Sequence, residues 1–368
     1  MKICYLANSA IPSSTASSIQ IVKMCEAFSQ LDNEVTLITA NTKIIDRDIF
    51  DFYNEKKKFR ITKLKKFNTF PLGIKYYLFS LFSIFESFKY KPDIYITRNF
   101  FSCFLLTLFK KKTIIELHHD LTIESRIVRF LIKDLKFLKS KYIKLAIAIT
   151  KGVKKEYVSN NYIDNHKINI LPSGSSLIIK KKKSLKKKSF KIGYFGSLYR
   201  SRGLELIQKL ARIDKKNSYH VYGNLSMLNY KKYKTSIPNL HYSNYVPYKV
   251  ITKHMCDMDI LIIPYVSTIT VAGDVGDITK FTSPLKLFDY LAAGKMIMCS
   301  DFKVLREIVD MRNVIFIKNY KNPFSWKMEI RKISHQSQKQ LIMAHNNNKL
   351  SKNYTLKRRA KKIIELIN

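Results

Sequence analysis

Apolar residues along the chain fall into two alternating patterns: short continuous runs, and longer stretches with helical spacing. The runs Ile3–Ala7, Val35–Thr39 and Thr113–Leu117 have the length of buried strands. Between the first two, apolar residues in 21–31 recur every three or four positions, as on one face of a helix. Ser18 is the expected N-cap of that helix. Strands that alternate with helices predict a parallel α/β sheet.

A second series of strand and helix patterns starts after a lysine-rich segment. Residues 180–188 contain seven lysines in nine positions, and like charges at this density stay solvated. We therefore predict a linker over 173–189, which separates a first domain, 1–172, from a second domain, 190–350. The remaining residues, 351–368, have the pattern of a basic helix.

Several polar residues directly follow predicted strands of the first domain. Ligands of open parallel sheets bind beyond the carboxyl ends of the strands, so these positions are candidates for a site. Ser17 and Ser18 lie in the serine-rich loop after the first strand, and Arg98 follows the predicted strand 93–97. His118 and His119 follow the strand Thr113–Leu117. A site here would use hydroxyl, guanidinium and imidazole groups.

A short helix with clear start and stop signals is predicted over residues 284–293. Ser283 is the expected N-cap, Pro284 suits the first helical position, and Gly294 suits the left-handed residue after the end. The first turn, with Lys286, would attract an anion such as phosphate. Asp289, about one turn further on, would accept hydrogen bonds from sugar hydroxyls. Phosphate and sugar side by side suggest a nucleotide-sugar.

Composition narrows the possible classes of protein. The chain has 368 residues, enough for two domains, and a formal charge of +40 that favours anionic partners. Its five cysteines are scattered, which indicates reduced thiols in a cytoplasmic protein. We find no signal peptide, no apolar run long enough to span a bilayer, and no dinucleotide or nucleic-acid-binding motif. No cluster of ligand residues predicts a metal.

Six blocks of sequence together resemble the GT-B glycosyltransferases of family 4, also called glycosyltransferase group 1. Two of them read Glu116-Leu-His-His-Asp120 and Ser283-Pro-Leu-Lys-Leu-Phe-Asp-Tyr-Leu-Ala292. The others are residues 19–28, 149–152, 193–198 and 259–265. The resemblance implies an α/β fold of two Rossmann-like domains facing across a cleft. It also implies that the C-terminal helix packs back on the first domain.

The resemblance implies a role for individual residues as well. Members of the family transfer a sugar from a nucleotide-sugar with retention of configuration, usually without a metal. Asp289 stands where a Glu usually holds the donor ribose, and Arg202 and Lys286 stand at or near diphosphate contacts. Leu285 lies on the backbone that approaches the phosphates, and His118 stands beside the reacting sugar. The nucleotide-sugar is then a substrate, and no cofactor is expected.

The expected partners are the nucleotide-sugar donor and a glycan or lipid-linked acceptor, as in polysaccharide or lipopolysaccharide synthesis. Basic and aromatic residues in 75–112 suggest that the protein rests on an anionic membrane from the cytoplasmic side. Two departures from the family pattern are the shorter Asp289 and a serine-rich loop, 13–18, without the usual glycines. Two alternatives stay open: a GT-B sugar-nucleotide epimerase, and a nucleic-acid-binding protein motivated by the charge.

Overall fold

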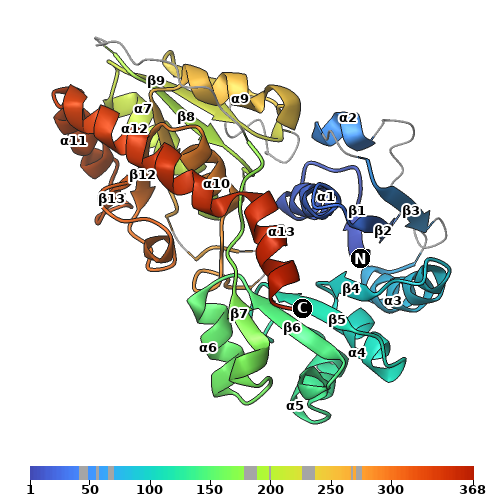
Figure 1. Cartoon of the computed structure of the whole chain (residues 1–368). Helices are drawn as coiled ribbons and strands as arrows, with labels where there is room; N and C mark the ends of the chain where they lie inside the picture. The colour runs from blue at the N-terminus through green and yellow to red at the C-terminus, as the bar shows by residue number, and fades with distance from the viewer. Residues whose placement is uncertain are drawn as a thin grey trace. The chain divides into compact units, whose positions relative to one another are not determined.

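The computed structural model divides the chain into two compact units. It describes residues 1–40, 49–54, 58–64, 70–177, 189–198, 200–225, 237–266, 268–270 and 276–368. Unit 1 contains Met1–Ser173 and Leu356–Asn368, and unit 2 contains Gly174–Thr355 (Figure 1). Most of the predicted linker, 173–189, lies outside the described residues. The final helix of the chain therefore belongs to the same unit as the N-terminus.

Unit 1 is built on a parallel sheet of seven strands in the order β3-β2-β1-β4-β5-β6-β7. The strands are β1 (Lys2–Ala10), β2 (Glu34–Ala40), β3 (Arg60–Leu64), β4 (Ile94–Thr97), β5 (Thr113–Leu117), β6 (Ile143–Ala148) and β7 (Ile168–Ile170). The helices are α1 (Ala16–Ser29), α2 (Ile49–Tyr53), α3 (Leu72–Phe88), α4 (Phe100–Leu108), α5 (Arg126–Lys133), α6 (Lys151–Ser159) and α13 (Leu356–Glu365).

Strand β1 shows why the strands of unit 1 read as continuous apolar runs. Successive side chains of a strand point to opposite faces of the sheet. Ile3 and Tyr5 pack in one cluster with α1 and α13, whereas Cys4 and Leu6 pack in another with α3 and α4. Both faces of the sheet are covered, so a polar residue on either face would be buried.

Unit 2 repeats this architecture with six parallel strands in the order β10-β9-β8-β11-β12-β13. The strands are β8 (Lys191–Phe195), β9 (Ser218–Tyr222), β10 (Leu240–Ser243), β11 (Ile260–Ile263), β12 (Met296–Ser300) and β13 (Val314–Ile317). The described helices are α7 (Leu204–Ile213), α9 (Tyr248–Asp257), α10 (Leu285–Ala292), α11 (Pro323–Ser334) and α12 (Ser337–Ser351). One face of the sheet packs on α7 and α11, the other on α9 and α10.

Gly203 fixes the passage from β8 into α7. Its φ is +85°, and a Cβ added there would lie 1.7 Å from the carbonyl oxygen of Pro264, which follows β11. Only glycine fits this position, because the neighbour is backbone and cannot move aside. The loop that carries Arg202 is thereby held against the end of β11.

Two sequence predictions of helix starts are wrong in detail. Ser18 does not cap α1: Thr15 does, and its side chain accepts a hydrogen bond from the Ser18 backbone N–H. At α10 the N-cap is Pro284, and no side chain, including that of Ser283, caps this helix. Gly294 has a φ of +58°, so the predicted left-handed stop is confirmed. No helix in the described ranges is long and apolar enough to cross a membrane.

Candidate functional site

Both sheets have a topological switch point, the place where the strand order reverses. In unit 1 it lies between β1 and β4, and in unit 2 between β8 and β11. Helices that follow the two central strands leave in opposite directions, so a crevice opens at the carboxyl ends of these strands. The candidate residues of each unit gather at its own switch point.

In unit 1 the switch point holds a pocket of about 220 Å³. Ser17, Arg98 and His119, three of the predicted candidates, line it together with the end of β1. The lining residues are Tyr5, Leu6, Ala7, Asn8, Ser9, Ser17, Ile21, Tyr76, Arg98, Asn99, His119 and Glu124. Ser18 is not among them, because it is buried and donates its hydroxyl to the carbonyl of Ala10.

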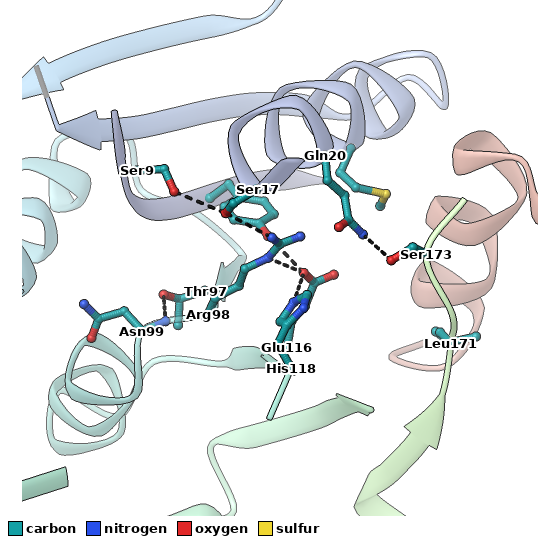
Figure 2. A network of polar contacts seen from close by, with 12 residues as sticks. Ser9, Ser17, Gln20, Thr97, Arg98, Asn99, Glu116, His118, Leu171 and Ser173 are labelled. Atoms are coloured by element: carbon teal, nitrogen blue, oxygen red, sulfur yellow. Dashed lines mark hydrogen bonds and ion pairs between the residues drawn. The ribbon is translucent and has the colours of Figure 1, made fainter. Parts of the chain in front are cut away.

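A buried carboxylate, Glu116, organises the groups next to this pocket (Figure 2). One of its oxygens accepts from Arg98 Nε at 2.7 Å, and the other accepts from Arg359 Nη1 at 2.7 Å. The Tyr5 hydroxyl donates to the first oxygen at 3.2 Å. Burial alone would raise the pKa of Glu116, but the charges of Arg359 and Arg98 outweigh it and hold the pKa well below its usual range.

Arg359 brings the last helix of the chain into this network. It lies on α13, and its Nε also donates to the carbonyl of Pro172 at 2.9 Å. On the opposite side of Glu116, Arg98 Nη1 reaches the Ser17 hydroxyl at 3.4 Å. The position of Arg98 at the pocket therefore depends on a residue near the C-terminus.

The two histidines after β5 have different surroundings. His118 Nε2 lies 3.5 Å from Glu116, and burial, with the charge of Arg98, lowers the pKa of His118 to about 4. It is therefore neutral at pH 7. His119 lines the pocket, and its Nε2 lies 3.6 Å from a carboxylate oxygen of Glu124. The catalytic role of His118 stays a prediction, while His119 is the one that lines the pocket.

In unit 2, two cationic side chains meet at the switch point. Lys286 Nζ donates to the Tyr194 hydroxyl at 2.8 Å and lies 5.6 Å from the ring centroid of Tyr265. The guanidinium of Arg202 lies 5.4 Å from the same centroid and donates to the carbonyl of Thr270. Burial, together with the charge of Arg202, lowers the pKa of Lys286 well below its usual range.

No carboxylate in the described part of the chain pairs with Lys286 or Arg202, and Arg202 Nε is buried without a hydrogen-bond partner. A Cβ added at Gly196, whose φ is +148°, would lie 2.9 Å from Lys286 Nζ, so the loop after β8 approaches this amine closely. Two basic side chains that pair with no carboxylate in the described ranges, next to a backbone loop in close contact with one of them, form a site suited to an anion.

Ser283, Leu285 and Asp289 belong to the same helix start. Leu285 is the first residue of α10, and its side chain is half-buried; the predicted role of its backbone at the phosphates stays a prediction. Asp289 Oδ1 accepts from the Ser175 hydroxyl at 2.5 Å and from the Tyr248 hydroxyl at 3.0 Å. Its carboxylate is thus already held by two protein hydroxyls, which fix its orientation.

No group of three His, Cys, Asp or Glu side chains suited to a metal occurs among the residues that the structure describes. Metal-independent chemistry stays a prediction.

Comparison with known proteins identifies the fold. No family model and no curated protein matches the chain. A glycosyltransferase from Rickettsia africae superposes with a TM-score of 0.72 at 13% identity, covering 100% of this chain and 97% of that one. Anabaena HepE in complex with UDP-glucose gives 0.70 at 14%, covering 99% and 98%. WaaG, a glycosyltransferase involved in lipopolysaccharide biosynthesis, gives 0.65 at 12%, covering 100% and 99%.

The chain has the GT-B fold. This confirms the predicted fold class of two Rossmann-like parallel-sheet units. At such low sequence identity the structural similarity establishes the fold only. The activity has to be inferred from the residues of the site.

Sequence reasoning missed several residues of the two GT-B units. It quoted Glu116 in a block of the family resemblance but gave it no role, although one acid in a buried run is itself a signal of a buried ion pair. It also missed Arg359, Tyr194 and the hydroxyls of Ser175 and Tyr248. These partners lie far apart in sequence, and no local pattern connects them.

Arg359→Met should lower the free energy of unfolding by about 3 kcal/mol, because it leaves Glu116 buried with one guanidinium fewer. Lys361→Met, at an exposed position of the same helix, should change it by less than about 0.5 kcal/mol. Urea unfolding at pH 7 measures both. Equal stability of the two variants would show that Arg359 does not hold the C-terminal helix in place.

His118→Gln should flatten the pH dependence of stability on the acid side. The pKa of His118 is about 4 when folded and ~6.5 when unfolded, so the unfolded state binds the proton first as pH falls. The resulting stability is present above pH ~6.5 and is lost toward pH 4, by about 2–3 kcal/mol at pH 4.5. Urea midpoints at pH 7 and 4.5 should differ less in the variant than in wild type.

The exposed His166→Gln serves as the matched control and should keep the wild-type slope. An unchanged slope in His118→Gln would mean that His118 titrates normally in the folded protein.

Proposed function

We propose that the protein is a retaining glycosyltransferase of family 4, which moves a sugar from a nucleotide-sugar to a glycan or lipid-linked acceptor. The observation that best supports this proposal is the pair of basic side chains, Lys286 and Arg202, at the switch point of unit 2, beside the start of α10. Related folds include one solved with UDP-glucose and one involved in lipopolysaccharide biosynthesis. In this proposal the reaction is a step in the synthesis of a cell-surface polysaccharide or lipopolysaccharide.

The electrostatics of Lys286 suit a diphosphate. Its ammonium is disfavoured because it is removed from water next to Arg202. A diphosphate would supply the missing negative charge and stabilise the ammonium. As the sugar leaves, charge builds up on the diphosphate, and fixed cations stabilise that charge in the transition state. Asp289, oriented by Ser175 and Tyr248, would accept hydrogen bonds from the ribose.

A thermal-shift panel of UDP-, GDP-, ADP- and CMP-sugars tests this proposal, since a ligand of the folded state raises its melting temperature. One nucleotide class should stabilise the protein. Lys286→Gln should weaken its binding by roughly 10- to 150-fold, because charge-assisted hydrogen bonds are worth about 1.5–3 kcal/mol. Asp289→Asn, which keeps the shape of the side chain, should weaken it less.

The matched control is Lys303→Gln, at an exposed position of unit 2, which should bind like wild type.

Turnover should persist when EDTA removes divalent metal ions, because the proposed reaction does not use a metal. Absence of any shift with all four classes would refute the donor site. Turnover of the donor that is independent of any acceptor would point to an epimerase, and tight, salt-sensitive binding of random DNA instead of nucleotide-sugars would point to a nucleic-acid-binding protein.

We also propose that unit 1 rests on an anionic membrane at its cytoplasmic side. The surface concerned, the aromatic face, consists of exposed Ile74, Leu81, Phe82 and Phe85 on α3 with Leu108 and Phe109 at the end of α4. The rings of Phe85 and Phe109 lie 6.0 Å apart, which joins the two helices into one surface. Lys110, Lys111 and Lys112 follow it directly, so apolar contact and positive charge occur together.

The double variant Phe82→Ser/Phe85→Ser should bind vesicles of phosphatidylglycerol and phosphatidylcholine at least about tenfold more weakly than wild type. Full burial of one such ring is worth about 1.5–3 kcal/mol. Cosedimentation measures the binding, and added salt should release the wild type, because each surface lysine contributes ~1 kcal/mol.

Phe324→Ser/Met328→Ser removes two apolar side chains that are equally exposed in unit 2 and should bind like wild type. Equal binding of wild type to neutral and anionic vesicles, or equal loss in both double variants, would exclude the aromatic face as the membrane contact.

A further inference from the structure

The charges beside the unit 1 pocket do not balance. Glu116 carries one negative charge, and Arg98 and Arg359 carry two positive charges against it. His118 is neutral at pH 7 and adds none. Within the cluster of Arg98, Glu116 and Arg359 one positive charge is therefore left over, and Arg98 is the member that lines the pocket. The other acid of the pocket wall, Glu124, lies 3.6 Å from His119, which balances its charge only when the imidazole is protonated.

Arg98 also has an unused donor. Its Nε is bonded to Glu116 and its Nη1 reaches Ser17, but Nη2 is buried and has no hydrogen-bond partner among the described residues. Figure 2 shows the guanidinium lying between Glu116 and Ser17. A buried, unpaired guanidinium nitrogen is expensive to leave unsatisfied, so it indicates a ligand that accepts there.

We propose that this pocket binds an anionic group of the acceptor, a phosphate or a carboxylate, through Arg98. The inference rests on the proposed function, which makes unit 1 the acceptor side. Arg98 would turn its unpaired guanidinium N–H to the anion, and the Ser17 hydroxyl, 3.4 Å from Nη1 and 3.4 Å from the Ser9 hydroxyl, would lie at the same wall of the pocket. The pocket's volume of about 220 Å³ lies below the ~300 Å³ at which drug-sized sites begin, which suits one small charged unit and not an extended chain.

Glu116 and Arg359 act as positioning residues in this site. Because Glu116 accepts from Nε of Arg98, the guanidinium is held at the wall of the pocket and its two other nitrogens do not bond to Glu116. Arg359 supplies the second positive charge, so Glu116 does not neutralise Arg98 completely. An arginine held in this way binds phosphate or carboxylate with less loss of side-chain entropy than a free one.

Calorimetry on the full chain with glucose 6-phosphate, glucuronate and glucose tests the inference. Wild type should bind one or both anionic sugars and bind glucose at least about tenfold more weakly. Arg98→Gln should lose at least tenfold in affinity for the anionic sugar. Arg126→Gln removes the same charge from an exposed position of unit 1 and should bind like wild type.

Ser17→Asp provides a second variant that leaves Arg98 and Glu116 in place. Ser17 is exposed in the first turn of α1, where an acid favours the helix, so the variant should fold. Its carboxylate would occupy Arg98 and repel the anion, with at least tenfold loss of affinity, whereas the neutral Ser17→Asn should bind nearly as well as wild type. Glucose bound as tightly as the anionic sugars, no binding of either anionic sugar at millimolar concentration, or wild-type affinity in Ser17→Asp would overturn the inference.

Two kinds of ligand separate this inference from the proposed function: the anionic sugar tests Arg98 in unit 1, and the nucleotide-sugar tests Lys286 in unit 2. An anionic sugar that bound at the donor cations would keep its affinity in Arg98→Gln and Ser17→Asp, so these two variants identify the pocket that holds it. If nucleotide-sugars bind but the Arg98 and Ser17 variants have no effect on the anionic sugar, the inference of an anionic acceptor is refuted and the proposed glycosyltransferase function is supported.

If the anionic sugar binds at Arg98 while no nucleotide-sugar binds, the inference about the pocket is supported and the proposed donor site is refuted.

Discussion

The burial of the Glu116 carboxylate is the constraint on which unit 1 depends. A lone carboxylate at 2% exposure would lose several kcal/mol of hydration, and a single partner seldom compensates for that loss. Two guanidiniums, from Arg98 at the end of β4 and Arg359 on α13, supply the compensation. The ion cluster therefore requires that the last thirteen residues of the chain belong to unit 1, although a complete second unit precedes them in sequence.

The two units share a strand order and differ in the electrostatics of their switch points. In unit 1 an acid lies between the two arginines and limits the excess charge to one. In unit 2, Lys286 and Arg202 stand together with no acid between them in the described residues, and aromatic rings take the place of counter-ions. The same backbone topology thus supplies one site in which an acid offsets the arginines and one site of two basic side chains without a paired acid in the described residues. This asymmetry is consistent with the proposed division into a donor side and an acceptor side.

The sequence was sufficient for the central strands because burial on both faces makes them continuous apolar runs. It was insufficient at the edge strand β3, which lies in a lysine-rich region and is half-exposed, so its apolar pattern is weak. Helix starts were misplaced by one to three residues. At α1 the hydroxyls of Thr15 and Ser18 are equivalent candidates for the cap, and α10 begins without a side-chain cap, so the hydroxyl of Ser283 does not mark its start.

The site was predicted only in part, because the sequence shows which residues follow the strands but not which distant residues pair with them. Positions after central strands can be read from the sequence, and Ser17, Arg98 and His119 do come together in one pocket. Their electrostatics cannot be read from the sequence, since Glu116 and Arg359 are 243 residues apart and no local pattern connects them. Without this pair, Arg98 is one of 67 basic residues in a chain of charge +40. Its distinction comes from burial: a cation fixed by a buried acid, with one donor still unpaired, is selective for an anion in a way that solvated lysines are not.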